Sequence, residues 1–220
     1  MSFIERIIGT FTNPDKAMAD VCKEPRWEEA LLIVGLLAVF AALSGYMGSK
    51  HISFTGEIPG GVDASMMNTI TMITTVVGGL LGPFITWIVA TVILFLLAMA
   101  FGGEGKLTSL LTGIGYSFIV KIIFVIISML LLTQAPYLAV EYSSNAAAII
   151  QAQAPYTSSM FVIASSIVGL IGLLWSCLIG VFALKHCQKL SLKSAAIVMI
   201  IPLAIYIIIT YGLMILSMIK

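Results

Sequence analysis

Long apolar runs separated by short polar stretches make up most of the chain. The runs cover about residues 30–49, 83–101, 116–137, 159–184 and 195–219. A helix needs about 20 predominantly apolar residues to cross a bilayer, and each run is close to that length. The runs are continuous, whereas the strands of membrane barrels alternate polar and apolar residues. The pattern therefore predicts an all-α fold, a polytopic integral membrane bundle with five spanning helices plus short interfacial helices.

The first 29 residues show an amphipathic pattern, and we assign residues 1–29 as cytoplasmic helices ahead of a transmembrane domain of residues 30–220. Ser2 is a suitable N-cap for a first short helix, and Asn13 followed by Pro14 can begin a second. Pairs of short amphipathic helices before a span commonly lie in the lipid headgroup region. A surface for a cytosolic protein partner is the alternative.

Pro25, Arg26 and Trp27 stand immediately before the first apolar run. Proline is favoured at the first position of a helix. Arg26 can reach lipid phosphates from there, and tryptophan is enriched at the boundary between water and lipid. These three residues are candidate functional residues at the start of the first span.

The polar stretches between the runs predict the loops. Residues 50–63 form an outer loop with a turn at 59–61, and residues 63–77 form a moderately apolar helix that packs on the outer surface or enters the membrane obliquely. The glycines and proline of residues 78–83 break that helix, so the second span begins near residue 83. Gly102 and Gly103 open a flexible inner turn, and residues 143–153 form a helix in an outer segment.

The distribution of lysine and arginine predicts the orientation, because cytoplasmic loops are enriched in both. With the N-terminus inside, five spans place the C-terminus outside, with Lys50 and Lys220 on the outer side and Lys121 inside a run. The other eight are then cytoplasmic: Arg6, Lys16, Lys23, Arg26, Lys106, Lys185, Lys189 and Lys193.

Lys121 interrupts the third run. A lysine at the bilayer centre costs about 2.5–3.5 kcal/mol on insertion scales. We therefore predict that residues 107–119 form a short interfacial or re-entrant helix, broken around residues 113–115. The span would then begin near residue 122, and the ammonium group would snorkel to the cytoplasmic phosphates. A polar cavity lined by Lys121 is the alternative.

Small residues recur one helical turn apart at three places, a spacing that lets helix backbones approach closely in a membrane. These pairs are Gly78 with Gly82, Ser165 with Gly169, and Ser176 with Gly180. We predict that Gly169 and Gly180 pack against other helices of the same chain. The alternative is that they form the seam of a homo-oligomer.

Composition and charge exclude several classes of function. Hydrophobic residues make up 60% of the chain and charged residues 10%, which fits lipid as the main solvent. The net charge of +1 does not suit a nucleic-acid partner. Cys22 and Cys187 fall on the cytoplasmic side and Cys177 inside the membrane, so no disulfide is expected. Cys22, Cys187 and His186 match no zinc spacing, so no metal site is predicted.

No motif in the sequence indicates catalysis. The chain has no nucleophile elbow and no glycine-rich phosphate loop between a strand and a helix. Apart from Cys177 and the tyrosines, Lys121 is the only ionisable residue within the predicted spans, so it has no second group to complete acid–base chemistry. We therefore expect no enzyme activity, no catalytic residue and no cofactor.

Three stretches together resemble the Yip membrane-protein family, named for interaction with Ypt/Rab GTPases, in its short prokaryotic form. They are Asn13-Pro14 with Glu24-Pro25-Arg26-Trp27, residues 101–107 continuing to Gly115-Tyr116-Ser117, and residues 172–175 continuing through the basic turn to residues 191–196. Gly102, Gly103, Gly115 and Tyr116 are candidate functional or packing residues within them. The resemblance implies five spans, a cytoplasmic N-terminus, and a scaffold role like that of eukaryotic relatives in vesicle trafficking.

We predict a non-enzymatic membrane scaffold or adaptor of the Yip type, in the cell membrane if the chain is prokaryotic. Its expected partners are membrane lipids, a further copy of the chain, and a cytoplasmic protein held by residues 2–29 and 185–194. The alternative function is a small transporter, channel or lipid-translocating protein, which would need a polar or lipid-filled path between the spans.

Overall fold

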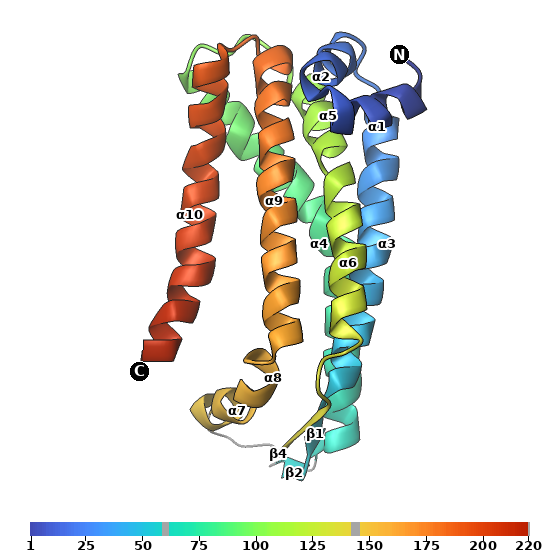
Figure 1. Ribbon diagram of the computed structural model, residues 1–220, viewed down its shortest axis with the longest axis vertical. Coiled ribbons are helices and arrows are strands. Elements are labelled where there is room, and N and C mark those ends of the chain that lie inside the picture. The colour runs from blue at the N-terminus through green and yellow to red at the C-terminus, as the bar shows by residue number, and fades with distance from the viewer. Residues whose placement is uncertain (59–61, 142–145, 220) are drawn as a thin grey trace. The chain divides into compact units, whose positions relative to one another are not determined.

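Long helices joined by short segments form the chain in a computed structural model, which describes residues 1–58, 62–141 and 146–219 (Figure 1). The helices in chain order are α1 (Phe3–Thr12), α2 (Pro14–Lys23), α3 (Trp27–His51), α4 (Ala64–Ala100), α5 (Leu107–Ser117), α6 (Ile119–Leu132), α7 (Ala146–Ala152), α8 (Ala154–Thr157), α9 (Met160–Cys187) and α10 (Leu192–Ile219).

Two short pairs of strands accompany the helices in the described part of the chain. β1 (Ile52–Thr55) pairs in parallel with β4 (Leu138–Glu141), with Ile52 opposite Leu138. β2 (Glu57–Ile58) pairs in antiparallel with β3 (Val62–Asp63). These strands belong to the segments between long helices, so the architecture remains helical.

Five helical segments among the described residues are long and apolar enough to cross a membrane. They are Trp27–His51, Ala64–Ala100, Leu107–Leu132, Met160–Cys187 and Leu192–Ile209. Many large apolar side chains on these helices are exposed, for example Leu32 at 66% and Leu130 at 65%. Lipid is the solvent in which such exposure is favourable. The predicted all-α fold with five spanning helices is confirmed.

The first two helices begin where the sequence predicted, and their caps explain why. The backbone N–H of Glu5 donates to the Ser2 hydroxyl at 3.3 Å, and the N–H of Ser2 donates to the Glu5 carboxylate at 2.7 Å. This reciprocal pair is a capping box, which satisfies two otherwise free donors. At α2, the N–H of Lys16 donates to the Asn13 side chain at 3.2 Å, and Pro14 occupies the first turn.

The chain folds into two compact units. The first unit holds residues 1–34, 86–120 and 174–220, and the second holds residues 35–85 and 121–173. In the first unit, Ala17, Met18 and Val21 of α2 are fully buried, and α2 packs against both α1 and α5. In the second unit, α3 and α4 approach closely, since a Cβ added to Gly79 would lie 2.6 Å from the carbonyl oxygen of Ala41.

The predicted break in the second span is wrong. Residues 64–100 form the single helix α4, which passes through the glycines of residues 78–82 and contains Pro83. Proline interrupts helices in water, but in a membrane the helix is the conformation that keeps most backbone groups satisfied. The helix predicted over residues 63–77 is therefore the first part of α4. The turn predicted at 59–61 lies outside the described residues.

The third span is divided, but at a different residue from the predicted one. α5 runs unbroken through residues 113–115, and the helix is interrupted at Phe118, whose N–H donates to the carbonyl of Gly115 at 3.1 Å. Lys121 lies in the first turn of α6 and is half-buried. Its snorkelling therefore stays a prediction. The outer helix predicted over 143–153 is α7, with residues 143–145 outside the described part.

The small-residue pairs are not all contact points within the chain. A Cβ added to Gly78, Gly82 or Gly169 would meet no other atom within 4 Å. The predicted close packing of Gly169 is therefore wrong for contacts within the chain, because spacing alone does not say which side of a helix faces a neighbour. Gly180 does face a neighbour, since an added Cβ would lie 2.5 Å from the methyl carbon of Met199.

His51 has a different environment from the solvated outer loop that the sequence indicated. It ends α3, is 4% exposed, and its Nδ1 lies 3.0 Å from the carbonyl oxygen of Ala135. Its ring stacks on Tyr137 with the centroids 4.4 Å apart. The parallel pairing of β1 with β4 brings these segments of the second unit together.

Candidate functional site

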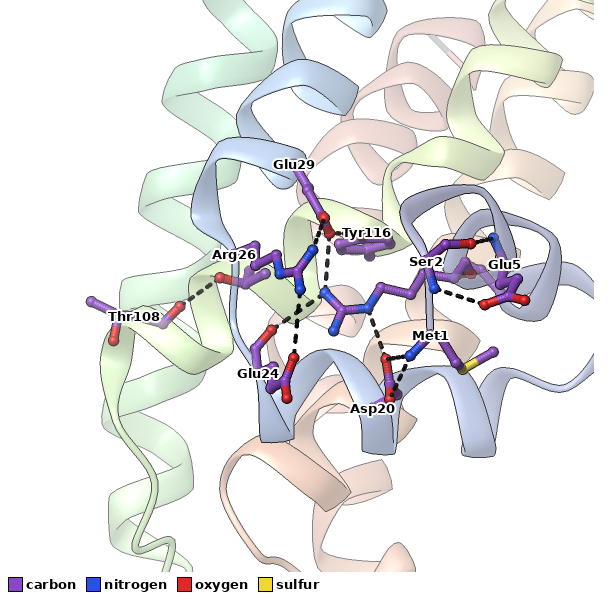
Figure 2. Close-up of polar contacts among 12 residues, drawn as sticks. Met1, Ser2, Glu5, Asp20, Glu24, Arg26, Glu29, Thr108 and Tyr116 are labelled. Carbon is purple, nitrogen blue, oxygen red and sulfur yellow. Dashed lines mark hydrogen bonds and ion pairs between the residues drawn. The ribbon is translucent and has the colours of Figure 1, made fainter.

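Arg6 is the centre of a buried charged group in the first unit. It lies on α1, is fully buried, and its Nε donates to the Asp20 carboxylate at 2.8 Å. Figure 2 shows Asp20, Glu24 and Glu29 with the polar contacts of this region. Its Nη1 donates to Glu29 at 3.1 Å and to the carbonyl oxygen of Glu24 at 3.3 Å. One guanidinium group thus joins α1 to the end of α2 and to the first turn of α3. A buried arginine requires such partners, because an unpaired charge is costly away from water.

Tyr116 connects this group to α5. It is fully buried, and its hydroxyl donates to the Glu29 carboxylate that also accepts from Arg6. The ring of Phe3 meets the ring of Tyr116 edge to face, with centroids 6.3 Å apart. We call Arg6, Asp20, Glu29 and Tyr116 the Arg6 cluster. It fixes both N-terminal helices, which we call the cap, to the beginning of α3 and to α5.

The edge of the Arg6 cluster is open to solvent. Arg26, whose side chain is 53% exposed, pairs with Glu29 at 3.3 Å and with Glu24 at 3.6 Å. The terminal ammonium group of Met1 pairs with Asp20 at 3.2 Å. The charges balance, with Met1, Arg6 and Arg26 positive and Asp20, Glu24 and Glu29 negative. These groups neutralise one another, which is typical of a structural network.

The pKa shifts outside the spans agree with that interpretation. Burial opposes the charged form of Arg6, but its hydrogen bonds to Asp20, Tyr116 and Glu29 prevail, so the pKa of Arg6 is raised. Burial likewise opposes ionised Asp20, and the bonds from Arg6 and the Met1 ammonium group lower its pKa. Both residues are therefore held in their charged forms at neutral pH.

A second group of contacts ties the cap to the end of α9. The Lys185 ammonium group donates to Asp15 at 2.6 Å, and Nε2 of His186 lies 2.7 Å from the same oxygen. These bonds, that from Lys185 first, lower the pKa of Asp15. Cys22 and Cys187 form a disulfide, with their Cα atoms 4.9 Å apart. We call Asp15, Cys22, Lys185, His186 and Cys187 the cap joint.

The expectation that no disulfide forms is therefore wrong. It rested on the reducing character of the cytosol, while the pairing depends on the fold, which brings together residues separated by 165 positions. The hydroxyl of Ser109 on α5 also donates to the Cys22 carbonyl oxygen at 3.1 Å. The segments 2–29 and 185–194, predicted together to hold a cytoplasmic protein, are thus parts of one joined structure.

The glycines of residues 102–105 allow the inner turn to pass beside this joint. Gly102 has φ = +82°, a backbone conformation that would be strained in a residue with a side chain. The N–H of Gly103 donates to the carbonyl of Ala98 at 2.8 Å, and an added Cβ there would lie 2.9 Å from the same oxygen. Gly105 lies against the carbonyl of Cys187, and the N–H of Glu104 donates to the carbonyl of Gln188 at 3.1 Å. The predicted flexible turn is a close-packed one.

The remaining candidates have diverse surroundings. Pro25 and Trp27 are exposed, with Trp27 as the first residue of α3. Gly115 is buried, and an added Cβ would lie 2.5 Å from the Cβ of Ala30 and 3.1 Å from Nε1 of Trp87. Among the candidates, Arg26, Tyr116 and Gly115 therefore meet around the start of α3.

The sequence alone did not identify Arg6, Asp15, Asp20 or Glu29 as site residues. The amphipathic pattern predicted that the first helices lie in the headgroup region and gave the polar side of α1 no partner, whereas Arg6 on that side is buried and Ile4 is 67% exposed. One signal was available: a carboxylate at position 29, beside an apolar run, needs a partner. Among the described residues, no group of three or more His, Cys, Asp or Glu residues is placed to hold a metal ion.

Comparison with known proteins agrees with the resemblance seen in the sequence. An uncharacterized protein of Methanocaldococcus jannaschii, MJ0794, is 27% identical over 124 residues, which are 56% of this chain and 85% of that protein. No solved structure matches the chain. The family model described as the Yip1 domain matches residues 8–214, which include the Arg6 cluster's Asp20, Glu29 and Tyr116 and the whole cap joint. The chain therefore belongs to the Yip1 domain family.

Proposed function

We propose that this Yip1-domain protein is a non-enzymatic membrane scaffold whose cap and basic turn, residues 185–194, together form one binding surface for a cytoplasmic protein. The observation that carries the proposal is the cap joint, in which Asp15 binds Lys185 and His186 and Cys22 is bonded to Cys187. A surface made of two distant segments can recognise a partner only if the segments keep a fixed position relative to each other. The cap joint fixes that position.

The proposed orientation places this surface in the cytoplasm. The charge bias of the sequence supports it, because eight lysines and arginines fall in segments predicted to be cytoplasmic, two in segments predicted to lie outside, and Lys121 within a predicted span. The surface also carries exposed lysines at positions 16, 23, 189 and 193. Such residues suit an acidic protein surface and do not need burial to act.

Membrane lipids are the second proposed partner. On α1, Ile4 is 67% exposed and Ile8 is 55% exposed, while Arg6 and Thr10 face inward. A helix that buries its polar side and exposes isoleucines is unfavourable in water and favourable at the boundary of headgroups and acyl chains. We infer that α1 lies in that boundary and leaves the exposed lysines of α2 for the protein partner.

A role without catalysis is supported by how the charged groups are used. Arg6, Asp20 and Glu29 bind one another inside the Arg6 cluster, and Asp15 is engaged by Lys185 and His186. Acid–base catalysis needs a group that can reach a substrate and change its protonation state near the working pH. The charged groups of the Arg6 cluster and the cap joint are each paired with other residues of the chain, so their role is to hold helices together.

Site-specific photo-crosslinking in intact cells tests the proposal. A benzophenone amino acid would replace exposed Lys16 or Lys193 on the surface, or Ile127, an exposed apolar residue of α6, as the control. The proposal expects a discrete protein adduct at both lysine positions and none at Ile127. Asp15→Leu, which removes the ion pairs of the joint, should weaken the adduct at Lys193.

The opposite outcome is equally clear. Absence of adducts at Lys16 and Lys193, with solute or lipid flux through reconstituted proteoliposomes, would contradict the scaffold and support a transporter. An adduct at Lys193 that is unchanged by Asp15→Leu would show that the cap is not needed for the surface.

A further inference from the structure

We propose that Cys22 and Cys187 form a reversible redox latch, a modification site at which a low-molecular-weight thiol–disulfide couple controls how firmly the cap is attached. The latch rests on the proposed function, because the cytoplasmic orientation exposes the pair to a reducing compartment. Disulfides there are usually transient and regulatory rather than permanent. The pair is therefore placed where both of its states can form.

The latch joins one particular pair of cysteines in the fold. Cys22 lies in the last turn of α2 and Cys187 is the last residue of α9, so the bond joins a cap helix to a spanning helix. The Cα atoms are 4.9 Å apart, within the usual range of about 4.4–6.8 Å for bonded cysteines. Cys177 lies ten positions earlier in α9 and outside this pair.

Each sulfur also lies beside a carbonyl oxygen that can accept a hydrogen bond from the thiol after reduction. The sulfur of Cys187 lies 3.2 Å from the carbonyl oxygen of Ser109, and that of Cys22 lies 3.7 Å from that of Ala183. In the disulfide neither sulfur carries a hydrogen, so these contacts become hydrogen bonds only in the dithiol. The same packing therefore accommodates both states without a buried, unpaired donor.

The two cysteine residues differ in exposure, which sets the order of the reaction. Cys187 is 5% exposed, whereas Cys22 is half-buried. A small thiolate attacks the sulfur of Cys22, forms a mixed disulfide and releases the thiolate of Cys187, which takes up a proton. A second small thiol then breaks the mixed disulfide and frees Cys22. Two small thiols are oxidised to one disulfide, and the protein disulfide is reduced to two thiols.

Reduction leaves the cap joint with non-covalent contacts alone. Asp15, which is 47% exposed, still pairs with Lys185 and His186. Ion pairs at such exposed positions are weak. The covalent bond also closes a loop of 165 residues, so it strongly restricts separation of α2 from α9 when present. Oxidation thus fixes the binding surface, and reduction lets α2 move away from the basic turn.

Hydrogen exchange on the full-length protein in nanodiscs tests the latch. The Cys177→Ala protein would be equilibrated at a series of ratios of reduced to oxidised glutathione. Thiols would then be counted by the gel shift of a maleimide–polyethylene glycol. We expect the pair to titrate as a unit, and amide exchange in α2 to rise by on the order of tenfold in the dithiol form. Exchange in the α10 segment 195–205 should stay the same.

Single-cysteine variants are the control for this experiment. Cys22→Ser and Cys187→Ser, each in the Cys177→Ala background, should show the faster exchange at every glutathione ratio. The latch is wrong if both thiols stay modifiable in fully oxidised glutathione, or if α2 exchanges equally in both states. A photo-crosslink at Lys193 that persists under either result would leave the scaffold intact, so the two proposals can fail separately.

Discussion

Arg6 shows how much a single buried charge can determine in this protein. Its guanidinium group binds Asp20, Glu29 and the carbonyl of Glu24 while fully buried. Arg6→Met keeps similar volume but leaves two carboxylates without their main partner. Removal of one member of a buried ion pair typically costs about 3–5 kcal/mol. We therefore expect a clear fall in the melting temperature of the purified protein in detergent.

Arg26→Met is the matched control for that measurement. Arg26 pairs with Glu29 and Glu24 in the same region, but its side chain is 53% exposed. Exposed pairs contribute about 0–1 kcal/mol, so the melting temperature should change little. Equal losses in the two variants would mean that burial of Arg6 does not decide the strength of the cluster.

Gly115 and Gly169 allow a second comparison between single positions. An added Cβ at Gly115 would meet Ala30 and Trp87, whereas one at Gly169 would meet nothing within 4 Å. Gly115→Ala should therefore destabilise the protein by about 1–3 kcal/mol through overpacking. Gly169→Ala should be neutral or slightly stabilising, because alanine is the better helix former. The melting temperatures of the two variants check this, and a destabilising Gly169→Ala would point to a contact with another chain.

The joint between α2 and α9 predicts a response to acid. The pKa of Asp15 is lowered by its bonds to Lys185 and His186. A lowered folded-state pKa means that the stabilising contribution is complete above the unfolded value of about 3.9. It is lost as the pH falls through the lower, folded-state pKa. Acidification below about pH 4 should therefore weaken the joint.

The measurement compares amide exchange in α2 of the reduced protein between pH 6 and pH 3, after correction for the intrinsic rate. Opening of α2 should increase toward pH 3 in the original sequence. Asp15→Asn should show the increased opening already at pH 6 and a smaller change with pH. Glu28→Gln, at an exposed position on α3, serves as control and should behave like the original sequence. An identical pH profile for Asp15→Asn would refute the role given to Asp15.

The beginnings of helices were easier to predict than their interruptions. Ser2, Asn13 and Pro14 act on neighbouring backbone groups, so local sequence was sufficient to place the starts of α1 and α2. Pro83 and the glycines before it looked like a break, yet α4 continues through them because a membrane favours unbroken helix. The interruption at Phe118 lies after residues 113–115, where the break was predicted. Such outcomes depend on neighbouring helices and on lipid.

Contacts between distant segments were the least predictable feature. Tyr116 was a candidate by family resemblance, but its partner Glu29 is 87 positions away, and Arg6 entered the sequence analysis only as one of the cytoplasmic basic residues. The Cys22–Cys187 pair was judged unfavourable from the expected compartment. Composition and hydrophobic runs indicate which segments lie in lipid, and hence predict the class of fold. They carry little information about which polar side chains meet.

At the scale of the whole molecule, each compact unit joins the ends of helices that are distant in the sequence. In the first unit, the cap, the turn at 101–106 and the turn at 188–191 are joined by the Cys22–Cys187 bond and by the Glu104 to Gln188 hydrogen bond. In the second unit, the end of α3 meets the segment after α6 through His51 and Ala135. Each unit is therefore held together by contacts between segments that are distant in the sequence.

Cysteine accessibility in intact cells tests whether the cap and the basic turn are cytoplasmic. The charge bias predicts that a cysteine at Ser191 is protected from an impermeant maleimide and that one at Gln151 is labelled. Both positions are exposed, so protection would come from the membrane and not from burial, as it would at the fully buried Gln188. The native cysteines would be replaced by serine or alanine, and labelling of both positions after lysis is the control. Labelling of Ser191 with protection of Gln151 would reverse the orientation, expose the cap to the outer medium, and make the disulfide of Cys22 and Cys187 a permanent bond in an oxidising environment.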